Sequence, residues 1–380
     1  MKLLPDRPSI EYLRKEAKDL LGVLRESRPG TSLAEAQRAL AAEYGVRDWP
    51  ALKAEVERRV ADAPAAPDGL AEELAETFGL GKVLAPATPV VFTAMGRCWD
   101  VTTERGRWLA VTVYDWITPE QAELGARLKD AADAAGVCSP VSVRSPQGQL
   151  VESVRAQRWR VHEWLEVGPS PVLPVSAAIA RRAGEVLGRL HSLAIPSSEP
   201  IHGYLTHRRS EDEWAELVGR ARTAGKPWAE RLAALLPGLR ELSAVELEVP
   251  QETWLCNRNL IPTHVRLGRG GQLVVMEWDF AGALTPELEI GAALTQWVMR
   301  PEVNVKGLRA FREGYGAAWP QLGMGAFAVG ISGWLNWAYN AICEAIDPGD
   351  ADLAAFAERE AVGVIERPMS RAVLEELLRG

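Results

Sequence analysis

Two short segments concentrate side chains that could move protons or bind an anion. The residues are Asn257, Arg258, Asn259 and His264 in the first segment, and Glu277 and Asp279 in the second. A carboxyl group that is buried beside an aromatic ring loses its water, so its pKa rises toward neutrality. Glu277, which precedes Trp278, is therefore the predicted general acid or base, and His264 is a second proton-transfer candidate.

The amide and cationic side chains of the first segment suit other tasks. Asn257 and Asn259 can donate hydrogen bonds to an oxygen on which negative charge develops, such as an oxyanion or an enolate. Arg258 could bind the ligand or hold the loop, and Asp279 could bind the ligand or hold the turn. The four cysteines show no metal-ligand spacing, so no metal site is predicted.

The order of residues in these segments resembles the catalytic loop and metal-binding turn of aminoglycoside phosphotransferases. In that family the loop reads His-x-Asp-Leu-x-Pro-x-Asn-Val and the turn reads Ile-Asp-Trp. Residues 256–265 and 273–282 keep this frame. By the resemblance, Asn257 stands for the His, Asn259 for the base Asp, His264 for the metal-binding Asn and Glu277 for the metal-binding Asp.

These replacements argue against phosphoryl transfer. A neutral amide at Asn259 cannot accept the proton of an acceptor hydroxyl, and the imidazole of His264 is a poor ligand for magnesium, which prefers oxygen. The resemblance also implies a phosphate-gripping Lys on the second strand, where the alignment places Thr112. No Lys lies between Gly96 and Gln121. The sequence therefore predicts absent or feeble nucleotide binding, and no cofactor.

The elements that must position these segments are typical of an α+β fold. Residues 97–103 and 106–114 alternate as two strands, and residues 119–135 are expected to form a helix. Residues 159–166 resemble the family's hinge, where backbone groups meet the adenine. The resemblance covers about residues 76–380. It implies a bilobal protein-kinase-like fold, with a small antiparallel-sheet lobe over a mainly helical lobe.

Four segments are expected along the chain. They are a helical N-terminal unit at 1–60, a linker at 61–75, a small β-rich lobe at 76–166 and a large helical lobe at 167–380. Ser9, Ser32 and Asp48 lie at the starts of three helices in the N-terminal unit. This unit resembles a short helical leader of actinobacterial proteins with varied functions, and no chemistry is assigned to it.

The large lobe is expected to supply a wall of the ligand pocket. His191, in the helix predicted at 179–192, is interpreted as a packing residue, whereas residues 333–340 line the acceptor pocket in the family. Asn336 and Asn340 are four residues apart and therefore share a helix face. The predicted substrate-binding residues are Arg258, Asp279, Trp278, Trp334, Asn336, Trp337, Asn340 and Tyr114.

Composition narrows the class of protein. A chain of 380 residues with 47% hydrophobic residues can bury a full core, and a net charge of −8 argues against a nucleic-acid partner. No apolar run of about 18 residues and no signal peptide are seen, so a cytoplasmic protein without a membrane partner is expected, as a monomer or homodimer. Fourteen tryptophans mostly suit core positions, and some suit an aromatic-walled pocket.

Three hypotheses follow. The first is an enzyme that uses the old nucleotide cleft for acid–base chemistry on a hydrophobic, polyketide-type natural product, as a dehydratase or cyclase. The second is a non-catalytic binder of a small molecule or antibiotic. The third is a residual phosphotransferase with relocated catalytic groups. The first is favoured because the replacing side chains still donate and accept protons.

Overall fold

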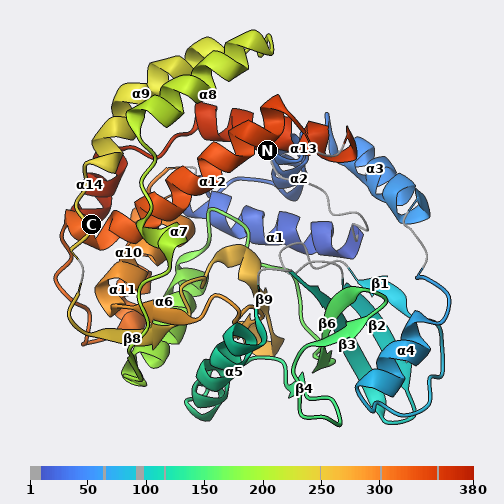
Figure 1. Cartoon of the computed structure of the whole chain (residues 1–380). Coiled ribbons are helices and arrows are strands. Elements are labelled where there is room, and N and C mark those ends of the chain that lie inside the picture. The colour runs from blue at the N-terminus through green and yellow to red at the C-terminus, as the bar shows by residue number, and fades with distance from the viewer. Residues whose placement is uncertain are drawn as a thin grey trace.

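The computed structural model describes residues 10–62, 66–90, 98–114, 117–248, 250–299, 302–348 and 351–380. Within them the chain forms a small lobe built on a sheet, a large helical lobe and an N-terminal group of three helices (Figure 1). This is the α+β, bilobal arrangement expected from the sequence. No helix in the described ranges is long and apolar enough to cross a membrane. Ser9, the predicted first helix cap, lies outside these ranges.

The small lobe is built on one antiparallel sheet. Its strands are β1 (Thr88–Val90), β2 (Cys98–Thr103), β3 (Gly106–Val113), β4 (Ser142–Val143), β5 (Glu152–Val154) and β6 (Gln157–Glu163). The spatial order is β1-β2-β3-β6-β4, and β5 also pairs with β6. The predicted strand pair is thus β2 and β3, which are joined by a turn at Gly106, a residue with positive φ.

The two faces of this sheet pack against different partners. Ala110 of β3 belongs to a hydrophobic cluster with helix α4 (Leu70–Thr77), whereas Leu109 and Val111 belong to a cluster with Val274 and Met276 of the large lobe. Side chains alternate along a strand, so Leu109 and Val111 face the large lobe.

This alternation corrects the placement of the missing lysine. Thr112 shares its face with Ala110 and lies opposite Trp159, which packs beside α4. The nearest β3 residue that faces the large lobe is Val111, one position earlier, and its cross-strand neighbour is Arg160. The cation beside Val111 therefore comes from Arg160 of β6, whereas Thr112 of β3 lies on the opposite face.

Two helices complete the small lobe. Helix α4 begins inside the segment 61–75 that the sequence assigned to the linker, because its apolar residues Leu70 and Leu74 cover the outer face of the sheet. Helix α5 (Pro119–Ala134) begins after the cap Thr118. At Gly125 a Cβ atom would lie 2.5 Å from the carbonyl oxygen of Trp278, so α5 closely approaches the turn of the large lobe.

The large lobe is mainly helical. Its helices are α6 (Ala177–Ser192), α7 (Gly203–Thr206), α8 (Glu211–Thr223), α9 (Ala229–Ser243), α10 (Pro286–Trp297), α11 (Val305–Tyr315), α12 (Ala328–Ile346), α13 (Ala351–Glu366) and α14 (Arg371–Arg379). Its short strands are β7 (Pro196–Ser197), β8 (Thr253–Cys256), β9 (Val265–Leu267), β10 (Leu273–Val275) and β11 (Gly282–Leu284). They form a three-stranded sheet in the order β11-β8-β7 and a β9–β10 pair, which hold the two candidate segments.

The N-terminal unit has its own small core. Its helices are α1 (Ile10–Ser27), α2 (Leu33–Glu43) and α3 (Trp49–Asp62). Leu13 of α1 packs with Ala41 and Leu52 of the other two helices. The predicted start of α2 is confirmed, because Ser32 and Glu35 form a reciprocal capping box there.

Candidate functional site

The loop after β8 and the turn after β10 are joined by Asn257. This side chain is fully buried, and its Nδ2 donates to the carbonyl oxygen of Glu277 over 3.0 Å. Its Oδ1 accepts from the backbone N–H of Asn259 over 3.1 Å. With both ends of the amide engaged by the backbone, Asn257 positions the loop against the turn. The sequence predicted that Asn257 donates to a ligand, and this prediction is wrong, because its Nδ2 already donates to Glu277.

Arg258 makes a second connection between loop and turn. Its Nε donates to the carbonyl oxygen of Phe280 over 2.5 Å, and its Nη2 donates to that of Ala281 over 3.3 Å. Arg258 has a positive φ of 62°, which is uncommon for a residue with a side chain. Its backbone N–H donates to Oε1 of Glu289 over 2.5 Å, and this bond stabilises the unusual conformation. Of the two interpretations of Arg258, the geometry supports the structural one.

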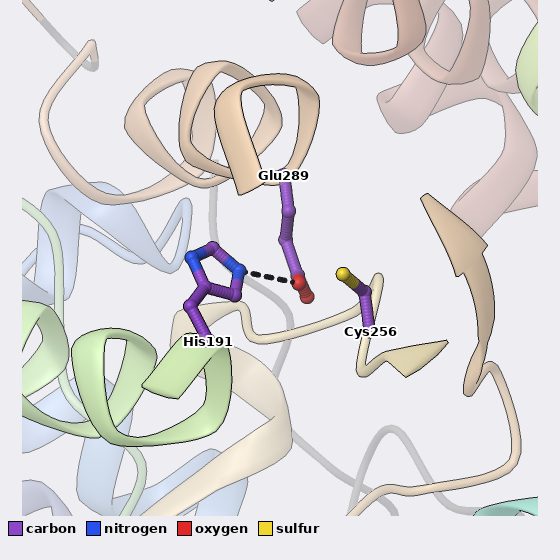
Figure 2. Close-up of side chains that lie close together, drawn as sticks. All are labelled: His191, Cys256 and Glu289. Carbon is purple, nitrogen blue, oxygen red and sulfur yellow. Dashed lines mark hydrogen bonds and ion pairs between the residues drawn. The ribbon is translucent and has the colours of Figure 1, made fainter. Parts of the chain in front are cut away.

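Glu289 belongs to a buried cluster with His191 and Cys256 that sequence reasoning did not assemble (Figure 2). Nε2 of His191 lies 2.9 Å from Oε2 of Glu289, and its Nδ1 lies 3.0 Å from the hydroxyl oxygen of Tyr315. Burial opposes the charge on Glu289, but the hydrogen bonds from His191 and from the Arg258 backbone outweigh it and lower the pKa of Glu289.

The donor types in this cluster are those of a zinc site, with all three ligand atoms within 4.8 Å of one another. Each group is nevertheless already engaged. Glu289 accepts at both oxygens, His191 is bonded at both ring nitrogens, and Sγ of Cys256 lies 3.7 Å from the carbonyl oxygen of Leu284. Hydrogen bonding accounts for the arrangement, and His191 is the packing residue that the sequence suggested.

Glu277 is the carboxyl group of the turn. It is 7% exposed, and its Oε1 accepts from the backbone N–H groups of Trp278 over 3.1 Å and of Asp279 over 2.9 Å. Burial, followed by the negative charge of Asp279, raises the pKa of Glu277 to about 7, although the charge of Arg160 opposes the shift. Burial, followed by the charge of Glu277, also raises the pKa of the half-exposed Tyr114.

Asp279 is held by the small lobe. Its Oδ2 is paired with Nη2 of Arg160, and both side chains are largely buried. Gln121 of α5 donates to the backbone carbonyl oxygens of Asp279 and Ala281, over 2.7 Å in each case. Sequence reasoning missed Arg160. Strand alternation over residues 157–163 was the signal that could have found it, because it places Arg160 on the same face as His162, opposite to Trp159 and Val161.

His264 ends the loop in a partly buried position. Its Nδ1 lies 3.2 Å from the carbonyl oxygen of Asn259. Burial lowers the pKa of His264 to about 4, even though the contact with Asn259 favours its protonated form. His264 is therefore neutral at pH 7. The side chain of Asn259 is partly exposed beside it.

The remaining predicted ligand-binding residues separate into buried and exposed groups. Trp278 packs against α5, and its Nε1 donates to the carbonyl oxygen of Val275. Trp334 is buried, and Asn336 donates from its buried amide to the backbone carbonyl oxygens of Tyr204 and His207. These contacts give Trp278 and Asn336 structural positions. Trp337 and Asn340 of α12 are exposed.

The site does not fit the magnesium nucleotide that the fold implies. Magnesium requires ionised or polar oxygen ligands. Glu277 uses Oε1 for two backbone hydrogen bonds, while Asp279 is occupied by Arg160. Asn259 supplies a neutral amide where the family has its base.

The fold and this site define a protein-kinase-like scaffold of the small-molecule phosphotransferase type. The sequence model of the phosphotransferase enzyme family matches residues 96–324, and the chain belongs to that family. This confirms the resemblance read from the loop and the turn. Among curated protein sequences, none matches the chain.

Solved structures show the same fold at low identity. Spectinomycin phosphotransferase, crystallised with ADP and spectinomycin, is 13% identical with a TM-score of 0.59, over 83% of this chain and 98% of that one. An aminoglycoside phosphotransferase from Alicyclobacillus acidocaldarius is 14% identical with a TM-score of 0.54, over 83% and 96%. A microcompartment-associated aminopropanol kinase is 13% identical with a TM-score of 0.51, over 81% and 96%.

Proposed function

We propose that this chain is an enzyme that uses the phosphotransferase scaffold for acid–base chemistry on a hydrophobic, polyketide-type natural-product intermediate. The reaction class is dehydration, Michael-type addition or the cyclisation that combines them. One observation carries the proposal: Glu277 is buried next to Asp279, with Oε1 bonded to the backbone N–H groups of the turn, and this environment raises its pKa to about 7. A carboxyl group with a pKa near the working pH can both take and return a proton.

The neighbouring groups supply the other functions that such a reaction needs. Removal of a proton next to a carbonyl leaves negative charge on its oxygen, and the partly exposed amide of Asn259 can donate to that oxygen. His264 is neutral and offers a second site for a proton. Tyr114, Phe280 and Trp337, which are 51%, 37% and 37% exposed, are the aromatic residues proposed to meet an apolar substrate. Asn257 and Arg258 position the loop.

A residual phosphotransferase is the second candidate, favoured by one observation. Arg160 presents a cation on the face of the sheet that meets the large lobe, beside Val111. A guanidinium there could bind a phosphate group if Asp279 released it. The non-catalytic binder is the third candidate, and it needs no proton transfer from Glu277.

Substitutions at three residues test the enzyme proposal. We expect Glu277→Gln to lower turnover by about 10²–10⁴-fold, because the amide keeps the size of the carboxyl but cannot exchange its proton. Asn259→Ala should cost about 10²–10³-fold if it stabilises an oxyanion, and His264→Ala tests the alternative base. The measurement is dehydration or ring closure of a panel of β-hydroxyacyl and enoyl thioesters, with folding checked by thermal melting. Normal turnover by all three variants would show that the chemistry lies at other residues, and binding of the substrates without turnover by the wild type would favour the binder.

Nucleotide binding separates the second candidate from the first. We expect calorimetry with ATP and magnesium to show no micromolar binding. We also expect Asn259→Asp to leave the protein without kinase activity, because a carboxylate at this position restores neither the metal ligands nor a free cation. Transfer of labelled phosphate to an aminoglycoside that is lost in Arg160→Met would favour the phosphotransferase instead.

A further inference from the structure

Arg266 projects into the space between the two lobes at the hinge end. It lies in β9, where its neighbour Leu267 packs into the core of the large lobe. Arg266 is opposite Val274 of β10, which packs against Leu109 and Val111 of the small sheet. Cross-strand partners share a face, so Arg266 faces the small lobe. Arg266 is only 6% exposed although it lies between the lobes.

The N-terminal unit supplies what covers this arginine. Arg266 donates to the hydroxyl of Ser170, and its charge interacts with the phenol of Tyr12 in α1. The Tyr12 hydroxyl is hydrogen-bonded to that of Tyr44, which donates to Oε2 of the buried Glu16 over 2.7 Å. A row of polar groups thus runs from Arg266 of β9 through Tyr12 and Tyr44 to Glu16 of the N-terminal unit.

A second contact lies at the hinge itself. Nζ of Lys15 is 2.5 Å from the position that a Cβ atom would take on Gly168. The backbone there is already paired with β9. The N–H of Gly168 donates to the carbonyl oxygen of Leu267 over 2.7 Å, and the N–H of Leu267 donates to that of Pro169 over 3.0 Å. Lys15 therefore covers the chain just beyond the predicted hinge, in a place where a side chain on residue 168 would displace it.

The far end of α1 is also attached to the large lobe. Nζ of Lys306, at the start of α11, lies 3.5 Å from the carbonyl oxygen of Glu26. The hydrophobic clusters that contain Leu13 and Leu20 hold residues of the N-terminal unit alone. The described contacts with the lobes are therefore polar and specific rather than a shared apolar core. In Figure 1, α1 lies between the helices of the large lobe and the small sheet.

We propose that the N-terminal helical unit closes the hinge end of the cleft, and that Tyr12, Lys15 and Arg266 exclude the base of a purine nucleotide from it. A planar base needs an apolar slot and free backbone groups at the hinge. Here it would meet a buried guanidinium whose hydrogen bonds it cannot replace, and this carries a large desolvation cost. The unit is thus part of the cleft and selects against nucleotides, whatever reaction Glu277 performs.

Full-length variants test this proposal with a readout that does not depend on turnover. Tyr12→Ala with Lys15→Ala removes both covering groups, and hydrogen–deuterium exchange is followed in the peptide that spans residues 164–169. We expect exchange in that peptide to rise at least about tenfold. Lys18→Ala is the matched control, because Lys18 lies on the same helix, whereas it is the Nζ of Lys15 that lies at Gly168. Its exchange should equal that of the wild type.

Nucleotide exclusion is measured with a fluorescent adenosine triphosphate analogue. We expect the wild type to bind it feebly, and Tyr12→Ala with Arg266→Leu to bind it at least about tenfold more tightly. Loss of protection in the N-terminal helices would show that Tyr12→Ala unfolds the unit. In that case the single variant Lys15→Ala is used, and exchange in the peptide 164–169 is the measurement. Two outcomes would overturn the proposal. One is equal affinity for the analogue in the wild type and in the protein with Tyr12→Ala and Arg266→Leu. The other is unchanged exchange of the peptide 164–169 in a variant whose helix α1 no longer contacts the lobes.

Discussion

Glu277 precedes β11 along the chain and Glu289 follows it, and both residues are at most 7% exposed. The protein nevertheless raises the pKa of Glu277 and lowers that of Glu289. Glu289 accepts hydrogen bonds at both oxygens, from His191 and from the backbone of Arg258. Glu277 accepts both of its recorded bonds at Oε1 and faces the negative charge of Asp279. Burial is common to the two residues, so their neighbours set the difference.

This difference assigns the two carboxyl groups to different tasks. A carboxylate that is charged and fully hydrogen-bonded is a rigid anchor, and Glu289 anchors the loop at Arg258. A carboxyl group with a raised pKa can exchange a proton near neutrality, which is the task that the proposed function gives to Glu277. Environments that separate the pKa values of neighbouring titratable groups often mark the working acid or base.

The largest expected effect is on stability at the anchor. Glu289→Ala should lower the free energy of unfolding by about 3–5 kcal/mol, because it leaves His191 and the Arg258 N–H buried without their acceptor. Denaturant titration at pH 7 measures this. Glu287→Ala is the control, since Glu287 is an exposed glutamate of the same helix, two residues before Glu289. A loss below about 1 kcal/mol for Glu289→Ala would show that Glu289 is no anchor.

The sequence identified the loop and the turn because their spacing survives even where the reacting residues differ. It could not show which side chains face the cleft. Thr112 was placed on the wrong face of β3 by one residue, and a one-residue shift in a strand reverses every side chain. Arg160 was missed because its role depends on Asp279, which lies 119 residues away.

The same limit applies to the helices. Asn336 and Asn340 share a face by spacing, but Asn336 is buried under the segment at 204–207 and Asn340 is exposed. The first residues of α4, 70–75, were assigned to the linker, and their apolar side chains become informative once the sheet that they cover is known. Tertiary contacts decide both cases, and no local pattern contains them.

The second effect concerns pH and separates the two glutamates directly. The pKa of Glu277 is raised from 4.5 to about 7 on folding, so its contribution to stability is full below pH 4.5 and is lost as the pH rises through 7. The contribution should change by about 3 kcal/mol over that window. The measurement is the difference in unfolding free energy between wild type and Glu277→Gln from pH 4.5 to 7.5.

That difference should fall with rising pH, because the glutamine does not titrate while the unfolded wild type releases its proton from pH 4.5 upward. Glu289 has a lowered pKa, so Glu289→Gln compared in the same way should give the opposite slope below pH 4.5. A flat difference for Glu277→Gln would mean that the carboxyl is ionised throughout, and the assignment of Glu277 as a proton carrier would fail.

The smallest effect concerns Cys256, the third member of the anchoring cluster. Its pKa is raised, by burial first and then by the charge of Glu289, so the thiol stays protonated and acts as a weak donor. Serine keeps a donor in the same place while shortening the reach to Leu284, so we expect Cys256→Ser to change the unfolding free energy by at most about 1 kcal/mol. Cys256→Ala removes the donor and should cost more than the serine variant, yet less than Glu289→Ala, since both oxygens of Glu289 keep their stronger bonds. Denaturant titration of the three variants gives the order.

If Cys256→Ala were as damaging as Glu289→Ala, the thiol rather than His191 and the Arg258 backbone would be the principal partner of the carboxylate. The contrast between the two glutamates would then need another physical basis.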